Sequence, residues 1–250
     1  MIPRLFDELK TRLFWRDAGA EFVASFCLMT AQSTLPTQWG QSLSPSAIQI
    51  GIGMGFVVFI MASSLGDFGG AHMNPAVSVA LVISRKISLI RGVLYVIIQC
   101  IACITGAGFV FAITPIKSQN NLAATLLGND VSSWQGVLVE IWITFMLVIT
   151  VLGATNTRIK GTLLIPGLPI GFAVALGIMS TNGYTGASMN PARSLGPAVI
   201  LGLWADHWVY WVGPIVGGVL AAGIYGGIFD RIKSDNRVHE IDTSANSIPA

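Results

Sequence analysis

The sequence predicts an all-α membrane protein with six transmembrane helices and two re-entrant half-helices, arranged as an inverted repeat. Three observations predict this class: few charged residues, six long apolar segments, and a short motif that occurs twice. Of the 250 residues, 53% are hydrophobic and 10% are charged, and the mean hydropathy is +0.69. A soluble domain has about 25% charged residues, so this chain has too few to cover a soluble globule.

The six long apolar segments fall at about 14–36, 47–66, 89–112, 134–154, 164–181 and 208–229. Each approaches the roughly 20 residues that an α-helix needs to cross a bilayer. Two further apolar pieces, at about 75–83 and 191–201, are too short to cross. Six crossings place both termini on the same side of the membrane.

The basic residues indicate which side that is. Twelve of the fourteen lysines and arginines lie at the termini or in connections on one side of the predicted membrane, and only Lys117 and Arg193 lie elsewhere. Because basic residues collect on the cytoplasmic side, we expect an integral membrane protein of the plasma membrane with both termini in the cytoplasm. The net charge of +2 gives no sign of nucleic-acid binding.

An internal repeat divides the chain into two halves. Residues 70–78 (GAHMNPAVS) match residues 186–194 (GASMNPARS) at seven of nine positions, with an offset of 116 residues. A glutamate in an early apolar segment precedes each copy, Glu21 in the first half and Glu140 in the second. Since each half has three crossings, the second half enters the membrane with the opposite topology, as in many transport proteins.

The centre of each copy predicts the start of a helix. Asparagine is a preferred N-cap and proline is favoured at the first helical position, so Asn74-Pro75-Ala76 and Asn190-Pro191-Ala192 each begin one short apolar piece. If these half-helices enter from opposite faces, their N-termini meet near the middle of the bilayer. The helix dipoles and asparagine NH₂ groups would then line a lumen that accepts neutral solutes and repels cations and protons.

The repeated Asn-Pro-Ala, together with the stretches AHMNPAV, NPARS and HWVYWVGP, resembles the aquaporin (major intrinsic protein) family. The similarity is closest to the water-channel branch of animal aquaporins and covers about residues 20–225. It implies a homotetramer with one pore per protomer and no cofactor. The implied organisation is a cytoplasmic segment 1–13, a channel domain 14–230 and a cytoplasmic tail 231–250. The repeats cover about 14–112 and 134–229.

The ionisable residues inside the membrane have structural roles in this interpretation. We expect Glu21 and Glu140 to accept hydrogen bonds from the backbone of the re-entrant loops, and His72 to brace the first loop, with a gating role for His72 left open. Neither carboxylate has a nucleophile or metal-binding partner in the sequence, so no catalytic site, metal site or enzymatic activity is expected. The three cysteines lie in apolar segments as small hydrophobic residues.

The resemblance also implies a selectivity filter, located by counting from each motif: Met54, Ile178, Ala187 and Arg193. Strict water channels have an aromatic residue and a histidine at the first two positions, and glycerol facilitators have two aromatics; this chain has neither pattern. Arg193 supplies a fixed positive charge opposite an apolar wall.

The sequence therefore predicts a passive channel for water, and also for small neutral solutes such as glycerol and urea, which excludes protons and ions. Two alternatives remain open: a strictly water-selective channel, or a poorly conducting structural or adhesion member of the same fold. The expected partners are the lipid bilayer, the permeating solutes and identical protomers.

Overall fold

The computed structural model describes residues 7–40, 43–156 and 165–230. Within these ranges the chain forms helices and irregular segments and no strands. Arg158, Lys160 and the predicted tail 231–250 lie outside the described residues. The statements below concern the described residues only.

Six long helices and two short ones confirm the predicted fold class. The long helices are α1 (Arg12–Thr34), α2 (Ala47–Leu65), α4 (Leu89–Ile113), α5 (Ser133–Ala154), α6 (Gly167–Thr185) and α8 (Val209–Ile224). The short helices are α3 (Pro75–Ile83) and α7 (Pro191–Leu201). Single turns of 3₁₀-helix occupy Asp7–Lys10 and Ile116–Ser118, and a π-helical turn, Tyr225–Asp230, extends α8.

Four of the helices are long and apolar enough to cross a membrane by length and composition: α2, α4, α5 and the segment Val209–Phe229. The helices α1 and α6 do not meet this criterion because they carry polar residues. The first half of α1 contains Arg12, Arg16, Asp17 and Glu21, and the last turns of α6 contain Ser180, Thr181 and Asn182. Both are nevertheless long helices of the bundle, close to the places that the sequence predicts.

The fifth predicted segment, 164–181, differs from the helix that forms. The helix α6 continues to Thr185 because its polar residues satisfy their own hydrogen bonds: the hydroxyls of Ser180 and Thr181 donate to the carbonyls of Leu176 and Gly177 at 2.7 and 2.8 Å. It ends where Gly186 adopts the left-handed conformation, with φ of 73°. Glycine is the residue best suited to this position.

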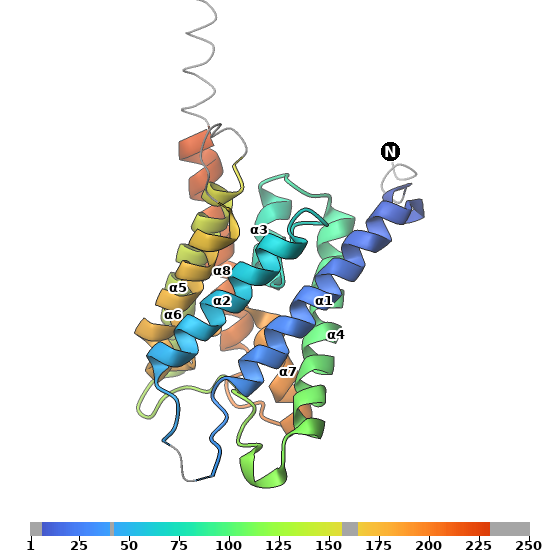
Figure 1. The fold of residues 1–250 in the computed structure, drawn as a ribbon. Helices are drawn as coiled ribbons and strands as arrows, with labels where there is room; N and C mark the ends of the chain where they lie inside the picture. The colour runs from blue at the N-terminus through green and yellow to red at the C-terminus, as the bar shows by residue number, and fades with distance from the viewer. Residues whose placement is uncertain (1–6, 41–42, 157–164, 231–250) are drawn as a thin grey trace, which may run out of the picture.

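The helices lie side by side as a tilted bundle, and the two half-helices occupy its interior (Figure 1). The start of α1 and the end of α8 lie at the same end of the bundle, the upper end in Figure 1, which we call the terminal end. The connections α1–α2 and α4–α5 lie at the opposite end. The half-helix α3 lies nearer the terminal end and α7 nearer the opposite end, as an inverted repeat requires.

Local capping explains where the helices begin. Ser46 and Ser132 form capping boxes with Gln49 and Gln135, and Ser88 accepts a hydrogen bond from the backbone N–H of Arg91 at 3.1 Å. Such caps satisfy backbone donors that the first helical turn leaves unpaired. The half-helices use their asparagines instead, as described below.

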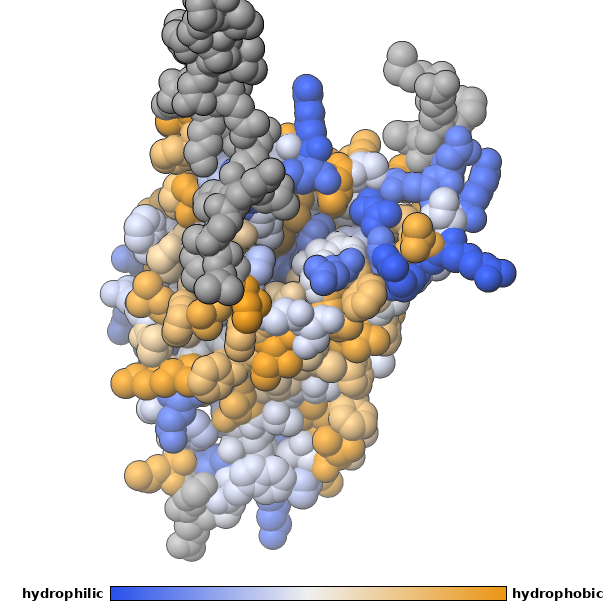
Figure 2. Space-filling view, turned by 45° about the horizontal axis from the view of Figure 1, so that its top comes forward, coloured by the Kyte–Doolittle hydropathy of each residue, from blue (hydrophilic) through white to orange (hydrophobic). Residues whose placement is uncertain are grey.

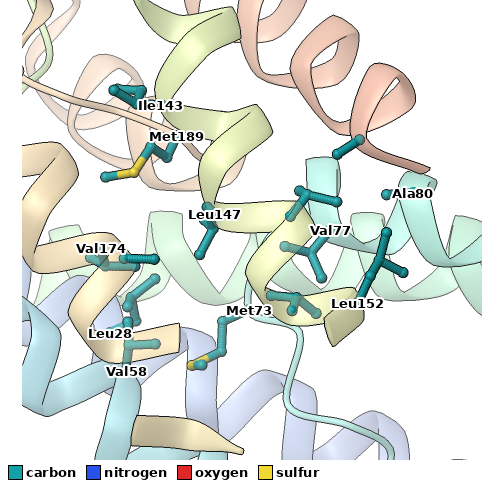
Figure 3. Close-up of a cluster of buried hydrophobic side chains, with 14 of the residues drawn as sticks. Leu28, Val58, Met73, Val77, Ala80, Ile143, Leu147, Leu152, Val174 and Met189 are labelled. Carbon is teal, nitrogen blue, oxygen red and sulfur yellow. The ribbon is translucent and has the colours of Figure 1, made fainter. Parts of the chain in front are cut away.

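The outer surface and the core suit a membrane protein. Figure 2 shows hydrophilic side chains gathered around the terminal end, above a belt of hydrophobic ones. Figure 3 shows the buried cluster inside the bundle, to which Met73 and Met189 contribute from the two re-entrant loops and Leu147 from α5. The loops are thus packed in protein, which non-helical backbone at membrane depth requires.

Glycines allow the closest helix contacts. Gly171 of α6 packs against the backbone carbonyl of Gly55 in α2, and any Cβ at Gly171 would overlap that oxygen. Small residues that let helix backbones approach closely are typical of membrane bundles. By contrast, a Cβ at Gly19 of α1 would meet no atom within 4 Å.

We therefore predict opposite outcomes for two glycine-to-alanine changes. Gly171→Ala should lower the free energy of unfolding by about 1–3 kcal/mol, because a backbone cannot move aside as a flexible side chain can. Gly19→Ala should leave it unchanged or raise it by up to about 1 kcal/mol, the helix propensity of alanine over glycine. Thermal unfolding of the purified protein in detergent measures both. Equal melting temperatures for the two variants would contradict the α2–α6 contact.

Candidate functional site

A cavity of about 280 Å³ lies along the interior of the bundle. Its lining includes Gln32, near the end of α1, and Thr155, just past the end of α5. The ends of these two helices lie at opposite ends of the bundle (Figure 1). Both motif asparagines, Asn74 and Asn190, contribute to its wall between those ends. The cavity therefore follows the direction in which a solute would cross the membrane.

The two Asn-Pro-Ala segments meet directly, and their asparagines are joined reciprocally. The side-chain Nδ2 of Asn74 donates to the carbonyl of Met189 at 2.7 Å, and Nδ2 of Asn190 donates to the carbonyl of Met73 at 2.7 Å. Each Oδ1 also caps its own half-helix, at 2.8 Å from Ala76 N and 3.1 Å from Ala192 N. Since an amide NH₂ has two hydrogens, one on each asparagine is left for a solute.

This contact corrects one detail of the sequence interpretation. The sequence predicts that the asparagine NH₂ groups point into the lumen, whereas one hydrogen of each NH₂ group bonds the loop of the other half of the repeat. The prolines Pro75 and Pro191 occupy the first position of α3 and α7, where no backbone donor is needed.

The two loops before the half-helices share the same unusual backbone. Ala71 and Met73 have φ of 45° and 54°, and their repeat equivalents Ala187 and Met189 have φ of 50° and 56°. Non-glycine residues rarely adopt this left-handed region, because it costs of order 1–3 kcal/mol for each residue, and they stay there only when surrounding contacts hold them. Contacts that hold these loops are therefore needed.

The two membrane glutamates make those contacts. Glu140 accepts hydrogen bonds from the backbone N–H groups of Ser188 at 2.9 Å and Met189 at 2.8 Å, and from the hydroxyl of Thr185 at 2.7 Å. Glu140 is fully buried. A carboxylate can accept several hydrogen bonds at once, and each bond satisfies a loop donor that would otherwise be unpaired in the membrane.

Glu21 makes the equivalent contacts in the first half. It is also fully buried and accepts hydrogen bonds from the backbone N–H groups of His72 and, at 3.0 Å, Met73. A third hydrogen bond comes from the side chain of Gln99 in α4, at 3.0 Å. The backbone donors to the two glutamates are therefore equivalent positions of the repeat, residues 72–73 and 188–189.

His72 lies on the cavity wall near the terminal end. Its Nδ1 is 3.1 Å from the hydroxyl of Ser78, and its ring packs edge-on against Tyr95 with 5.2 Å between ring centroids. Tyr95 in turn accepts a hydrogen bond from Arg91 at 3.0 Å. These contacts fix the imidazole from two sides.

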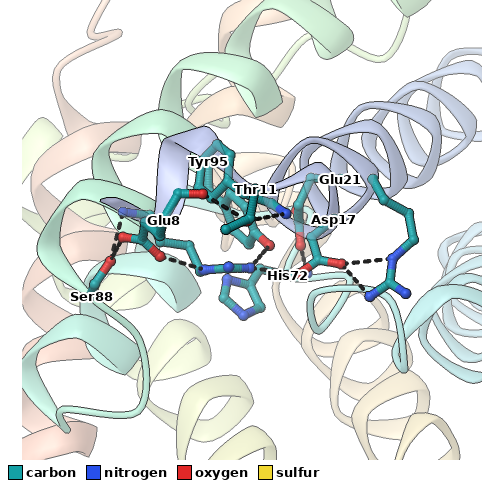
Figure 4. Close-up of polar contacts among 10 residues, drawn as sticks. Glu8, Thr11, Asp17, Glu21, His72, Ser88 and Tyr95 are labelled. Atoms are coloured by element: carbon teal, nitrogen blue, oxygen red, sulfur yellow. Dashed lines mark hydrogen bonds and ion pairs between the residues drawn. The ribbon is translucent and has the colours of Figure 1, made fainter. Parts of the chain in front are cut away.

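A polar cluster surrounds Arg91 beside this histidine (Figure 4). Arg91 donates to Asp17 at 2.8 Å and approaches Glu8 at 3.4 Å, and Glu8 also bonds the hydroxyl of Ser88. The cluster joins the start of α1, the start of α4 and the first loop. Asp17 is buried, at 8% exposed, and a buried charge persists only when it is paired.

The four predicted filter positions lie around the same cavity. Met54, Ile178, Ala187 and Arg193 all contribute to its wall, and each is at most 5% exposed. Arg193 Nη2 donates to the carbonyl of Gly186 at 3.4 Å, whereas Nη1 has no hydrogen-bond partner among the described residues. A buried guanidinium donor beside an open space is placed to meet a solute.

Several residues of the site were missed by the sequence analysis. Three side chains form hydrogen bonds with the membrane glutamates or with the last serine of a repeat copy: Gln99, Thr185 and Thr125. Nothing in the local sequence marks them, because each lies far along the chain from its partner. Ser78 and Ser194 could have been noticed, since they are identical positions of the nine-residue repeat.

No cluster of three or more histidine, cysteine, aspartate or glutamate side chains that could hold a metal ion exists in the described ranges. The site offers hydrogen-bond donors and acceptors around a passage. Fold and cavity together define a polytopic membrane channel built as an inverted repeat.

Comparison with known proteins gives the family. The model of the family "Major intrinsic protein" matches residues 8–225. Aquaporin-4 of Mus musculus is 42% identical over 232 residues, covering 90% of this chain and 70% of that protein. Aquaporin-2 of Bos taurus is 39% identical over 218 residues, covering 87% and 80%. The chain belongs to the major intrinsic protein (aquaporin) family, and is an integral membrane channel and not an enzyme.

A solved structure agrees on the fold. The aquaglyceroporin from Plasmodium falciparum superposes with a TM-score of 0.75, over 88% of this chain and 98% of that one. Its sequence identity is 24%, so the likeness concerns the fold alone.

The glutamate contacts generate a prediction. In Glu140→Gln, an NH₂ group would replace one carboxylate oxygen and face either the backbone N–H of Met189 or that of Ser188. We expect the free energy of unfolding to fall by about 1–3 kcal/mol or more. The matched control is Asp206→Asn, because Asp206 bonds the hydroxyl of Ser133 at 2.7 Å in a half-exposed loop where water can replace the contact. Thermal unfolding in detergent compares the two. A Glu140→Gln variant as stable as the control would show that the carboxylate does not hold the loop.

Proposed function

We propose that this protein is a passive channel for water and for small neutral solutes such as glycerol and urea, and that it excludes protons and ions. The observation that carries the proposal is the reciprocal contact of Asn74 and Asn190 on the wall of a cavity that follows the bundle. It brings two half-helix N-termini and two amide donors to one place in the passage.

Exclusion of cations and protons follows from the charges at that place. Each helix N-terminus carries about half a positive charge, and both act on the same short stretch of the cavity. Arg193 adds a full positive charge nearer the opposite end. Positive dipoles and an arginine are barriers of the kind that exclude protons and cations from water-conducting pores.

The proposed narrowing at Met54, Ile178, Ala187 and Arg193 supports passage of more than water. Arg193 Nη1 is an unpaired donor for a hydroxyl or carbonyl oxygen, while the methionine, isoleucine and alanine supply an apolar wall. A three-carbon polyol can place its CH₂ edge against such a wall while its hydroxyls meet polar groups. A solute whose hydroxyls form hydrogen bonds in the narrowing avoids a desolvation penalty of about 1–3 kcal/mol for each hydroxyl.

The location and assembly belong to the same proposal. The protein would lie in the plasma membrane with both termini in the cytoplasm, as the distribution of basic residues favours. The channel domain would span residues 14–230 and assemble as a homotetramer with a pore in each protomer. Large apolar side chains on the outer helix faces, such as Phe56 and Trp142, at 59% and 60% exposed, suit contact with lipid or with a neighbouring protomer.

Light scattering by proteoliposomes tests the proposal. Purified protein is reconstituted and exposed to osmotic gradients of an impermeant solute, glycerol and urea, with a pH-sensitive dye to follow protons. We expect flux of water, glycerol and urea above that of empty liposomes, and no proton flux. Passage of water alone would indicate a strictly water-selective channel, and no flux at all would indicate a structural member of the family.

The filter proposal predicts the effect of one substitution. Ile178→His should reduce glycerol and urea permeability by about tenfold while changing water permeability much less. The imidazole narrows the opening and removes the apolar surface on which the CH₂ edge of glycerol would lie. One solute hydroxyl left without a hydrogen bond accounts for a factor of this size. Ile178→Leu is the control, since it keeps the wall apolar. The same liposome assay measures both. Equal loss of water and glycerol permeability in the histidine variant would show that Ile178 does not discriminate between solutes.

Mercurial reagents provide a second test of the filter. None of Cys27, Cys100 and Cys103 lies on the wall of the cavity, and Cys103 is fully buried in the helix packing, whereas Ala187 lies on the wall. We expect the unmodified protein to be blocked weakly by HgCl₂ and Ala187→Cys to be blocked strongly and reversibly by thiol. Rapid block of the unmodified protein that disappears on replacing one of the three cysteines would contradict this placement.

A further inference from the structure

The connection between α4 and α5, residues 114–132, is anchored beside the proposed narrowing by one buried hydroxyl. Thr125 is 5% exposed and its hydroxyl donates to the hydroxyl of Ser194 at 2.7 Å. Ser194 is the residue directly after Arg193. The connection is also held by Leu122, which is 2% exposed, and by Gly128, whose N–H donates to the carbonyl of Tyr184 at 2.8 Å.

Three hydroxyls form a directed chain from this connection to the second motif. The hydroxyl of Ser188 donates to the carbonyl of Asn190 at 3.0 Å, so its hydrogen is used. Ser194, 2.6 Å from Ser188, must therefore donate to it, and Thr125 donates to Ser194. A hydroxyl has one hydrogen and two lone pairs. When Thr125 donates to Ser194, Ser194 to Ser188 and Ser188 to the carbonyl of Asn190, each of the three hydroxyls donates its hydrogen once.

The first half of the chain contains the same brace with a different third member. His72 and Ser78 are the repeat equivalents of Ser188 and Ser194, and they too are in contact, at 3.1 Å. There, Gln99 of α4 donates to Ser78 at 2.9 Å and occupies the place that Thr125 takes in the second half. The first brace thus ends on a transmembrane helix, whereas the second ends on a connection between helices.

The position of Thr125 also affects the partner of Arg193. Gly186, whose carbonyl accepts from Arg193 Nη2, packs so closely on Thr125 that a Cβ at Gly186 would lie 3.3 Å from Thr125 Cα. Thr125 therefore contacts both sides of the arginine: the residue that follows it and the loop that accepts its hydrogen bond.

We propose that Thr125 is a positioning residue for solute selection, which holds Arg193 and the filter loop at a fixed spacing through Ser194 and Ser188. The inference rests on the proposed function, in which the narrowing at Arg193 selects solutes. Without the Thr125 hydroxyl, Leu122 and Gly128 still hold the connection 114–132, but Ser194 is no longer bonded to it. Arg193 and the loop 186–190 are then held less firmly, and the opening becomes wider and less uniform.

The test is the ratio of glycerol to water permeability in proteoliposomes. Thr125→Val keeps the shape and removes only the donor, and it leaves no buried hydrogen unpaired, since Ser194 still donates to Ser188. We expect the ratio to rise by about twofold to tenfold, the factor that the loss of one neutral hydrogen bond carries. Thr125→Ser restores the hydroxyl and should restore the ratio of the unmodified protein.

Two further variants keep the test decisive. Ser194→Ala breaks the chain of hydroxyls at its middle, so it should raise the permeability ratio on its own. Adding Thr125→Val to it should raise the ratio no further. Ser194→Ala also serves in place of Thr125→Val if that variant does not fold. Thr105→Val makes the same change on the exposed face of α4, where the hydroxyl donates to the carbonyl of Ile101 in its own helix and does not line the cavity; it should leave the ratio unchanged.

The outcomes separate this inference from the proposed function. Unmodified protein that conducts no water would overturn the proposed function itself. Conducting protein whose ratio is unaffected by Thr125→Val or Ser194→Ala would overturn the role of Thr125 alone. A shift of equal size in Thr125→Ser or Thr105→Val would show a general loosening of the fold, and would also overturn it.

Discussion

The structure depends on satisfying irregular backbone at membrane depth, where no bulk water is available to do it. The two re-entrant loops contain four non-glycine residues with positive φ, so their N–H groups cannot be paired as in a helix. Glu21 and Glu140 accept those donors from buried positions on α1 and α5. The half-helices can begin where they do only because these carboxylates hold the loops that precede them.

The asparagines complete the arrangement by joining the two halves. Asn74 and Asn190 each cap their own half-helix and donate to the loop of the other half, so the halves cannot separate without leaving buried donors unpaired. An unsatisfied buried donor costs about 1–3 kcal/mol. The same contact places two positive helix ends on the cavity wall, so one set of hydrogen bonds supports both the fold and the proposed exclusion of cations.

The two halves share a backbone plan but differ in side chains, and the differences coincide with the ends of the cavity. Toward the terminal end, the first loop is braced by a histidine and by Gln99 of α4, beside the charged cluster around Arg91. Toward the opposite end, the second loop is braced by serines and by Thr125, beside Arg193. The two positions at which the nine-residue copies differ thus provide an imidazole at one end of the passage, where His72 replaces a serine, and a guanidinium at the other, where Arg193 replaces a valine.

The sequence by itself determined the fold class, the six long helices, the two half-helices and the residues that begin them, because apolar length, helix caps and a nine-residue repeat are local patterns. It also located Glu21, Glu140 and the four proposed filter positions, Arg193 among them, through the repeat and the family resemblance. Only the tertiary structure decided that each asparagine donates across to the other half, that Gln99 and Thr125 take equivalent places, and that Gly55 and Gly171 touch. These contacts join residues far apart in the chain, and their partners are chosen by how the helices pack and not by any neighbouring residue.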